Sequence, residues 1–158
     1  MPDAHVGTTP PRTVGQRVAD ARARLEGDVD AWVATADPGR GVPHLVPLSY
    51  LWDGETLLVS TPATSPTARN LQATGTARVG LGPTRDVVMV EGTVTWEEAA
   101  AIPADVGDAF AARTGFDPRE SAWRYLWFRI RPRRVQAWRE ADELAGRELM
   151  RDGTWLAP

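Results

Sequence analysis

The feature that most constrains the fold is a pair of strand-like runs joined by the dipeptide Asp53-Gly54. In the first run, residues 42–52 (VPHLVPLSYLW), apolar residues alternate with others, which is the pattern of a strand with one buried face. Asp-Gly favours the tight turn of a β-hairpin, and residues 55–61 (ETLLVST) return as the partner strand. The first run contains two prolines, which cannot donate ladder hydrogen bonds, so we expect an edge strand or a bulged one.

The rest of the chain is made of further short strands and few helices. We expect strands at 30–36, 76–82, 87–96, 123–132 and 133–140, with a possible bulge at Gly92. We expect helices at 13–28, 65–75 and 97–115, the last split by Pro103, and a tail with a helix-like stretch, a turn and an extended end. The helices are too few to cover a parallel sheet on both faces. We therefore predict a mainly β (α+β) fold, a six- to seven-stranded antiparallel split β-barrel with accessory helices.

Length and composition set the expected domain organisation and argue against several kinds of site and partner. The 158 residues suit a single domain, 1–158, with residues 1–12 as a flexible N-terminal arm. The absence of cysteine excludes disulfides and thiolate metal sites, and His5 and His44 do not form a ligand cluster, so we expect no metal. A net charge of −3 argues against nucleic-acid binding. With no apolar run near the ~20 residues that span a bilayer and no secretory signal, we expect no membrane association and a cytoplasmic protein.

Tryptophan is frequent, with 7 residues. Trp32, Trp52, Trp96 and Trp123 fall where strand packing would use them, and we expect most of the tryptophans in the core. The arginines of 129–139 form a local basic cluster. It could contact an anionic ligand, or it could be a solvated edge paired with the carboxylates that follow it.

Residues 61–70 gather side chains that suit an anion. Ser65 is a candidate N-cap with Pro66 at the first helical position, and a helix N-terminus offers free N–H groups to a phosphate. Thr61, Ser65 and Thr67 add hydroxyls, Arg69 adds a bidentate donor and Asn70 adds an amide. A purely structural interpretation is also open, because Ser-Pro commonly caps helices and Arg and Asn are common on exposed helix faces.

The segments 43–71, 77–82 and 87–96 together resemble the pyridoxamine 5′-phosphate oxidase-like split-barrel superfamily of flavin- and deazaflavin-binding proteins. In that superfamily a strand–Asp-Gly–strand hairpin precedes a loop with Ser and Arg-Asn-Leu, matched here by Ser65 and by residues 69–71. The resemblance implies that this loop holds the phosphate of FMN or of coenzyme F420. One departure is Thr67, which stands where family members commonly carry lysine, so phosphate affinity could be lower here.

The resemblance also implies an arrangement of the cofactor. The ring would rest in a groove between the two subunits of a homodimer, against Val46, Pro47, Leu48 and Ser49. Trp138 is the best candidate for a further ring-lining residue. The cofactor itself performs hydride transfer, so the resemblance assigns no catalytic side chain.

We therefore predict an oxidoreductase that uses coenzyme F420 or FMN for hydride transfer to or from a small organic substrate. Pyridoxamine phosphate oxidation itself is disfavoured, because the C-terminal Arg and His motif of that enzyme was not found in the chain. Two alternatives stay open: a non-catalytic protein that binds or carries flavin, F420 or haem, and a homodimeric barrel without a cofactor.

Overall fold

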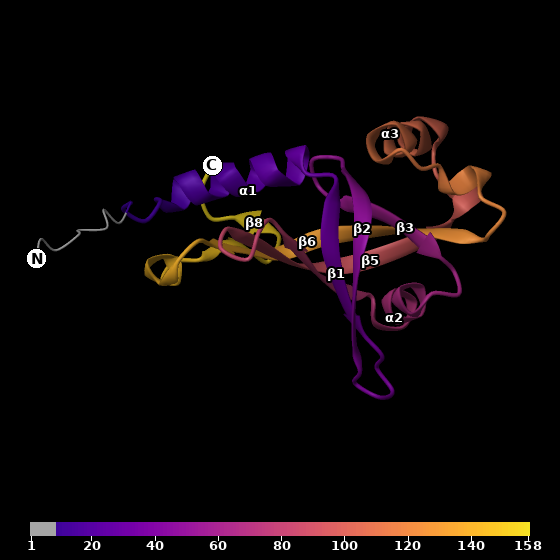
Figure 1. Ribbon diagram of the computed structural model, residues 1–158, viewed down its shortest axis with the longest axis horizontal. Coiled ribbons are helices and arrows are strands. Elements are labelled where there is room, and N and C mark those ends of the chain that lie inside the picture. The colour runs from indigo at the N-terminus through magenta and orange to yellow at the C-terminus, as the bar shows by residue number, and fades with distance from the viewer. Residues whose placement is uncertain (1–8) are drawn as a thin grey trace, which may run out of the picture.

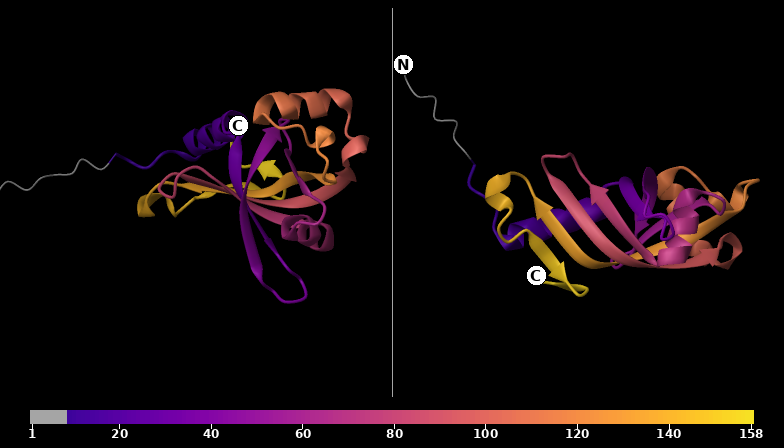
Figure 2. Two further views of the ribbon diagram at one scale, coloured as in Figure 1. Left: turned by 45° about the vertical axis from the view of Figure 1, so that its right-hand side comes forward. Right: turned by 90° about the horizontal axis from the view of Figure 1, so that it is seen from below.

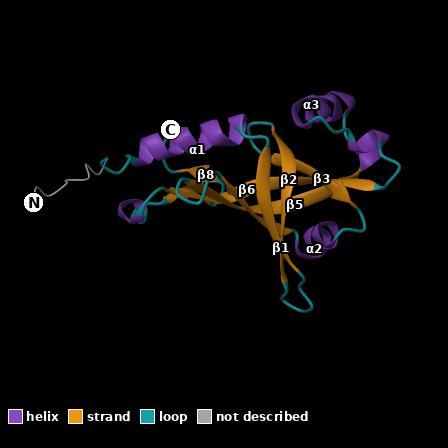
Figure 3. Ribbon diagram, viewed as in Figure 1, coloured by secondary structure: helices purple, strands orange, loops and turns teal. Residues whose placement is uncertain are grey.

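The computed structural model describes residues 9–158. Residues 1–8, with His5 and most of the predicted arm 1–12, lie outside the described residues. Figures 1 and 3 show the elements of the described part. Its helices are α1 (Val14–Gly27), α2 (Pro66–Thr74) and α3 (Ala104–Thr114), with short 3₁₀-helices η1 (Ala99–Ala101), η2 (Pro118–Glu120) and η3 (Ala141–Glu143). Its strands are β1 (Asp30–Ala36), β2 (Pro43–Trp52), β3 (Leu57–Pro62), β4 (Thr76–Leu81), β5 (Val87–Glu98), β6 (Tyr125–Trp138), β7 (Glu148–Arg151) and β8 (Thr154–Trp155).

Six strands close into an antiparallel barrel. Neighbouring strands pair in the order β3-β2-β1-β4-β5-β6, and β3 pairs back with β6. Strands β7 and β8 extend the sheet beyond β6. This arrangement confirms the predicted mainly β, antiparallel barrel with accessory helices. Within residues 9–158, no helix is long and apolar enough to cross a membrane.

Strand β6 corrects one sequence prediction. Residues 123–132 and 133–140 were expected as two strands, but Tyr125–Trp138 is one strand of 14 residues. The register with β5 shifts between Glu91 and Gly92, because Gly92 pairs with Pro132 and Glu91 pairs with Arg134. The predicted irregularity at Gly92 is therefore confirmed, and a bulge at this point lets the strand continue through a proline. A Cβ on Gly92 would lie 2.7 Å from Ile130 Cγ2, so the close approach of the two strands requires glycine.

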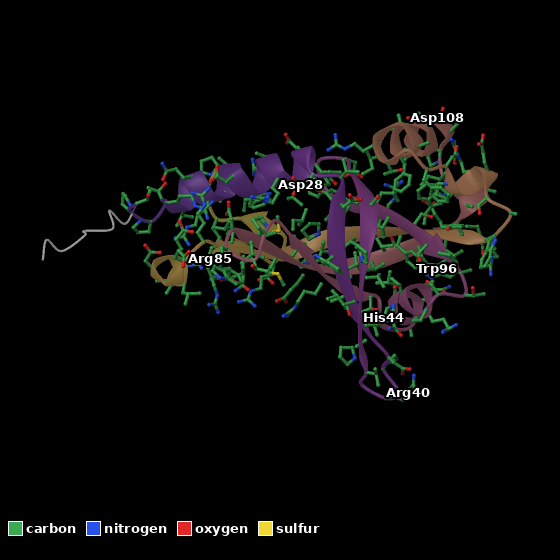
Figure 4. All side chains as sticks on the ribbon, in the orientation of Figure 1. Asp28, Arg40, His44, Arg85, Trp96 and Asp108 are labelled. Carbon is green, nitrogen blue, oxygen red and sulfur yellow. The ribbon has the colours of Figure 1, made fainter. Side chains whose placement is uncertain are left out.

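Strand β2 is an edge strand over half of its length. It pairs with β1 from Pro43 to Ser49, but β3 pairs only with Tyr50–Trp52. The prolines of β2 lie in the part that has no β3 partner, which agrees with the predicted edge. The hairpin of β1 and β2 projects from the barrel (Figure 2), with Arg40 at its tip (Figure 4).

Helix α1 covers the barrel with one apolar face. The predicted helix 13–28 is confirmed, with Thr13 and Gln16 forming a capping box. Val18, Ala21 and Leu25 are fully buried in the main core. The Tyr50 hydroxyl donates to the carbonyl of Leu25 at 3.0 Å, and burial raises the pKa of Tyr50. The last turn of α1 is thus fixed to β2.

Helix α3 covers a second, smaller core on the outside of the barrel. This cluster contains Leu58, Ile102, Phe110 and Trp127, and the rings of Phe110 and Trp127 meet edge to face at 4.8 Å. Pro103 separates η1 from α3, as predicted. The helical stretch begins later than predicted, because residues 97–98 still belong to β5.

The prediction of a core position is wrong for three of the four tryptophans that fall in or near predicted strands. Trp32 is 53% exposed, Trp96 46% and Trp123 72%, whereas Trp52 packs against the main core. Trp32 lies between the buried residues Ala31 and Val33 on β1, so its side chain points away from the barrel interior. Alternation along a strand identifies two faces, but it does not say which face is covered.

Charged pairs tie distant segments together. Arg12 and Glu143 form an ion pair at 2.7 Å, which connects the start of the described chain to η3. Four arginines of the 129–139 cluster also pair with carboxylates of other elements. Arg129 pairs with Asp53, Arg131 with Glu55, Arg134 with Glu91 and Glu148, and Arg139 with Asp86. These contacts favour the paired-surface interpretation for the four, although the carboxylates are not the neighbouring ones that we expected.

Candidate cofactor site

Strands β2 and β3 separate after a short pairing, and α2 begins where β3 ends. The two strands pair from Tyr50↔Val59 to Trp52↔Leu57, and β3 then continues along β6, where Pro62 pairs with Tyr125. Within residues 9–158, no strand therefore pairs with the backbone of residues 43–49 on its β3 side. The structure thus places the predicted ring-lining residues, 46–49, and the predicted phosphate residues, 61–70, on elements that flank one opening in the sheet.

The N-terminus of α2 has the predicted cap. Ser65 is the N-cap, its hydroxyl accepts a hydrogen bond from the Ala68 amide at 3.0 Å, and Pro66 is the first helical residue. Gly75 ends the helix in a left-handed conformation with φ of 63°. In the first turn Pro66 has no N–H and Ala68 donates to Ser65, so the amide of Thr67 is the first-turn donor left for a bound anion.

Two hydroxyls meet at this N-terminus. Thr61 Oγ1 and Ser65 Oγ are 3.1 Å apart, since Thr61 is the second-last residue of β3 and lies four residues before the cap. Thr61 is buried and Ser65 is half-buried. The arrangement leaves the Ser65 oxygen shared between the Ala68 amide and Thr61.

Arg69 adds positive charge close to the same point. Its Nη1 donates to the Thr64 carbonyl at 2.6 Å, which folds the exposed side chain back over the loop before α2. Among residues 9–158, no carboxylate pairs with Arg69. Arg124, whose backbone carbonyl accepts a hydrogen bond from the Ala63 amide, is instead paired through its guanidinium with Glu98, and this hydrogen bond lowers the pKa of Glu98. The positive charge of Arg69 is therefore available to a bound anion.

Asn70 and Thr67 lie on the buried face of α2. Asn70 Nδ2 donates to Thr35 Oγ1 on β1 at 3.0 Å, and Thr67 is 2% exposed. The amide of Asn70 thus holds α2 against the barrel. Thr35 was not found from the sequence, where it is one of many threonines in strands and has no distinguishing signal.

The β2 residues present two faces of an edge strand. Val46 and Leu48 are half-buried on the barrel side, and Leu48 packs against the core. Pro47 is exposed, and the Ser49 hydroxyl donates to the Asp30 carboxylate. These side chains leave the backbone as the part of the segment that could hydrogen-bond a flat ring.

Trp138 does not come near α2 within one chain. Tyr125, at the start of β6, pairs with Pro62, and Trp138 lies at the other end of β6. At about 3.3 Å per residue the strand spans roughly 40 Å, and α2 and β8 lie on opposite sides of β1 in Figure 1. The guanidinium of Arg147 lies 5.6 Å from the centroid of the Trp138 ring. Arg147 has no distinguishing signal in the sequence, because its contact with Trp138 joins two separate segments.

A cavity of about 500 Å³ opens beside the other end of α2. It is lined by small and hydroxyl-bearing residues of β1, β4 and β5, such as Ala34, Thr35, Thr76 and Thr93, and by Arg78. Thr35 belongs both to this cavity and to the contact that holds Asn70. The cavity is therefore adjacent to the candidate site on α2.

A match to a protein-family model identifies the family of this chain. Residues 19–139 match the model of the family described as pyridoxamine 5′-phosphate oxidase. This chain belongs to that family. The pyridoxamine 5′-phosphate oxidase-like fold family includes flavin- and F420-binding oxidoreductases. A comparison with curated proteins found no match.

Solved structures of family members share the fold. A conserved hypothetical protein from Mycobacterium tuberculosis is 21% identical with a TM-score of 0.62, covering 78% of this chain and 85% of that one. An F420 reductase is 19% identical with a TM-score of 0.56, covering 72% and 94%. A pyridoxamine 5′-phosphate oxidase-related, FMN-binding protein from Nostoc punctiforme is 18% identical with a TM-score of 0.52, covering 77% and 81%. At these identities the comparison shows a common fold.

Proposed function

We propose that this protein binds coenzyme F420 or FMN and uses it to transfer hydride to or from a small organic substrate. The observation that carries the proposal is the N-terminus of α2, where two hydroxyls and the Thr67 amide lie near Arg69, which has no carboxylate partner within residues 9–158. Family membership and neighbours named for F420 and for FMN support the choice of cofactor.

The phosphate of the cofactor would bind at this N-terminus. The Thr67 amide would donate to it, helped by the partial positive charge of the helix end. The hydroxyls of Thr61 and Ser65 can each rotate a hydrogen toward an anion. Arg69 can release the Thr64 carbonyl and donate to a phosphate, since a charge-assisted bond is stronger than a neutral one. Asn70 would support the site by holding α2 in place.

The ring would lie along the unpaired edge of β2. Between Val46 and Ser49 the backbone N–H and C=O groups on the β3 side are free of ladder bonds, and a flavin-type ring presents matching donors and acceptors at its edge. The cofactor, when bound, supplies the hydride chemistry. The protein's part is to orient the ring and the substrate and to exclude water, and we assign no catalytic side chain.

We propose that a homodimer completes the site. Trp138 and Arg147 lie too far from α2 to reach a cofactor bound by the same chain, so they would line the site of the other subunit. The outer face of the β1–β2 hairpin exposes Trp32 and Leu45, which are 53% and 60% exposed. An apolar surface of this kind suits a second copy of the chain. Light scattering should give the mass of a dimer, and Leu45→Arg should give a monomer.

A titration of the purified protein with F420 and FMN, side by side, tests the proposal. Ser65→Ala and Arg69→Ala should each weaken binding by about 1–3 kcal/mol, or roughly 5- to 150-fold in Kd. Arg85→Ala is the matched control, because Arg85 is an exposed arginine paired with Glu140. Binding that is the same in all three variants would remove the α2 N-terminus from the site.

A non-catalytic role is the second candidate, and Thr67 favours it. The position where family members commonly have lysine holds a buried hydroxyl here, so the protein would bind flavin, F420 or haem as a carrier. Turnover separates the two candidates. An enzyme consumes reduced cofactor in the presence of electron acceptors, whereas a carrier binds it without consuming it.

A further inference from the structure

The second opening in the sheet lies along β6. Strand β3 pairs with β6 up to Ile130, and β7 pairs with β6 from Val135 onward. Between them, the amide of Gly153 in the β7–β8 turn donates to the Arg133 carbonyl at 2.8 Å. A cavity of about 490 Å³ occupies this gap, bounded by α1, the β2–β3 turn and the β7–β8 hairpin. We call it the seam pocket.

Apolar side chains form part of the seam pocket. Trp52 and Trp155 line it together with Pro132 and Met150. Trp52 and Trp155 are both partly buried against the main core, and Met150 is buried. The volume lies within the range of ordinary small-molecule sites, roughly 300–1,000 Å³.

Charged groups of both signs line the same cavity, and only two of them pair with each other within residues 9–158. Arg131 and Glu55 form an ion pair at 3.0 Å. In contrast, Arg22, Arg133, Glu26 and Asp152 also line the pocket, and none of these four lies within 4.0 Å of an opposite charge in residues 9–158. Arg22 is one turn from Glu26 on α1, yet its guanidinium lies 4.9 Å from the centroid of the Trp155 ring.

We propose that the seam pocket binds a small zwitterion with an apolar body, of the α-amino acid class. A carboxylate can accept two parallel hydrogen bonds from an unpaired guanidinium, Arg133 or Arg22. An ammonium group can bind Glu26 or Asp152, and the apolar part can pack on the tryptophan rings. A ligand with one charge alone would leave the carboxylates or the guanidiniums of the pocket without a partner, whereas a zwitterion matches both.

Calorimetric titration of the full-length protein, without cofactor, tests the charge requirement. The probes are L-phenylalanine, 3-phenylpropanoate, which lacks the ammonium, and phenethylamine, which lacks the carboxylate. We expect L-phenylalanine to bind and each analogue to bind at least about tenfold more weakly. Equal affinity for the three probes, or no heat from L-phenylalanine up to about 10 mM, would overturn the proposal.

Variants test the place of binding. Arg133→Gln and Glu26→Gln should each weaken L-phenylalanine binding about tenfold or more, and both side chains are exposed, so we expect unchanged melting temperatures. Arg85→Gln removes an arginine outside the pocket and should bind as the unmodified protein does. If Arg85→Gln weakened binding as much as Arg133→Gln, the ligand would be held by overall charge and the assignment would be wrong. Because no cofactor is present, the result is independent of the flavin titration.

Discussion

The barrel opens twice, and the two openings are closed differently. At the first, between β2 and β3, α2 turns polar side chains inward, and Thr67 and Asn70 are buried beside Ala68 and Leu71. At the second, along β6, α1 turns Val18, Ala21 and Leu25 inward, all fully buried, and it buries one charged residue, Arg17, whose guanidinium donates to the Glu143 carbonyl. Buried polar groups stabilise a helix only when they are hydrogen-bonded. We infer that α1 stabilises the fold, whereas α2 is the helix suited to a ligand.

The hydrogen bonds that hold the two helices in place also differ. Helix α1 is fixed by residues distant in sequence: Tyr50 of β2, Arg113 of α3 and the contacts of η3. Helix α2 packs Ala68 and Leu71 into the main core, but its polar anchors are only the neighbouring Ser65 and one bond to Thr35. Loss of an apolar side chain under α1 should therefore affect the stability of the whole fold, and loss of a polar anchor of α2 should have a smaller effect.

The largest expected effect is that of Leu25→Ala. Leu25 is fully buried in the main core, and truncation of a buried leucine costs about 2–5 kcal/mol because it leaves a cavity. Urea unfolding should show this loss. Leu156→Ala, at a leucine that is 46% exposed, is the control and should cost far less. Similar losses in both variants would contradict the role given to α1.

Glu143→Gln tests the electrostatic anchor. Glu143 is 3% exposed and accepts hydrogen bonds from the Arg12 side chain and from the amides of Arg12 and Arg139. The Arg12 guanidinium lowers the pKa of Glu143 to about 2. Loss of one partner of a buried pair costs about 3 kcal/mol, which we expect in urea unfolding at neutral pH.

The same pair predicts a pH dependence. The folded-state pKa of Glu143 lies below its ordinary value of 4.5, so its contribution to stability is present above about pH 4.5 and is lost as the pH falls toward 2. The difference in unfolding free energy between the unmodified protein and Glu143→Gln should shrink over this range. A constant difference would show that the carboxylate charge has no part in the anchor.

Asn70→Ala should have a smaller effect on stability than the changes at Leu25 and Glu143. It leaves Thr35 without its partner and should cost about 1–2 kcal/mol. Thr35→Val and the double variant complete a mutant cycle, in which the two single losses should not add. Arg69→Ala, on the exposed face of α2, should change stability by less than about 0.5 kcal/mol. Additive losses at Asn70 and Thr35 would mean that their bond does not hold α2.

Local patterns in the chain were enough to predict most elements. The alternation of 42–52 and the Asp-Gly turn predicted the β2–β3 hairpin, and Ser65-Pro66 predicted the start of α2 to the residue. The continuity of β6 was missed, because Pro132 normally interrupts a strand and the bulge opposite Gly92 requires both strands. The exposure of Trp32 was missed because the covering of a sheet face depends on other elements.

The candidate site was predicted only in part for the same reason. Helix capping and hydroxyl spacing are local, so Thr61, Ser65 and Arg69 could be placed together from the sequence. The bond of Asn70 to Thr35 and the contact of Arg147 with Trp138 join segments that are far apart or differently oriented. Such contacts have no sequence signal in a single chain.

The sequence by itself determined the antiparallel class of the barrel and the cap of α2, because turn chemistry, alternation and capping act over a few residues. Only the tertiary structure decided where the barrel opens. Each opening arises where a strand changes its pairing, at Val59 for β2 and β3 and at Ile130 for β3 and β6. Pairing between strands depends on packing throughout the barrel, so the two openings and the groups that line them follow from the closed sheet as a whole.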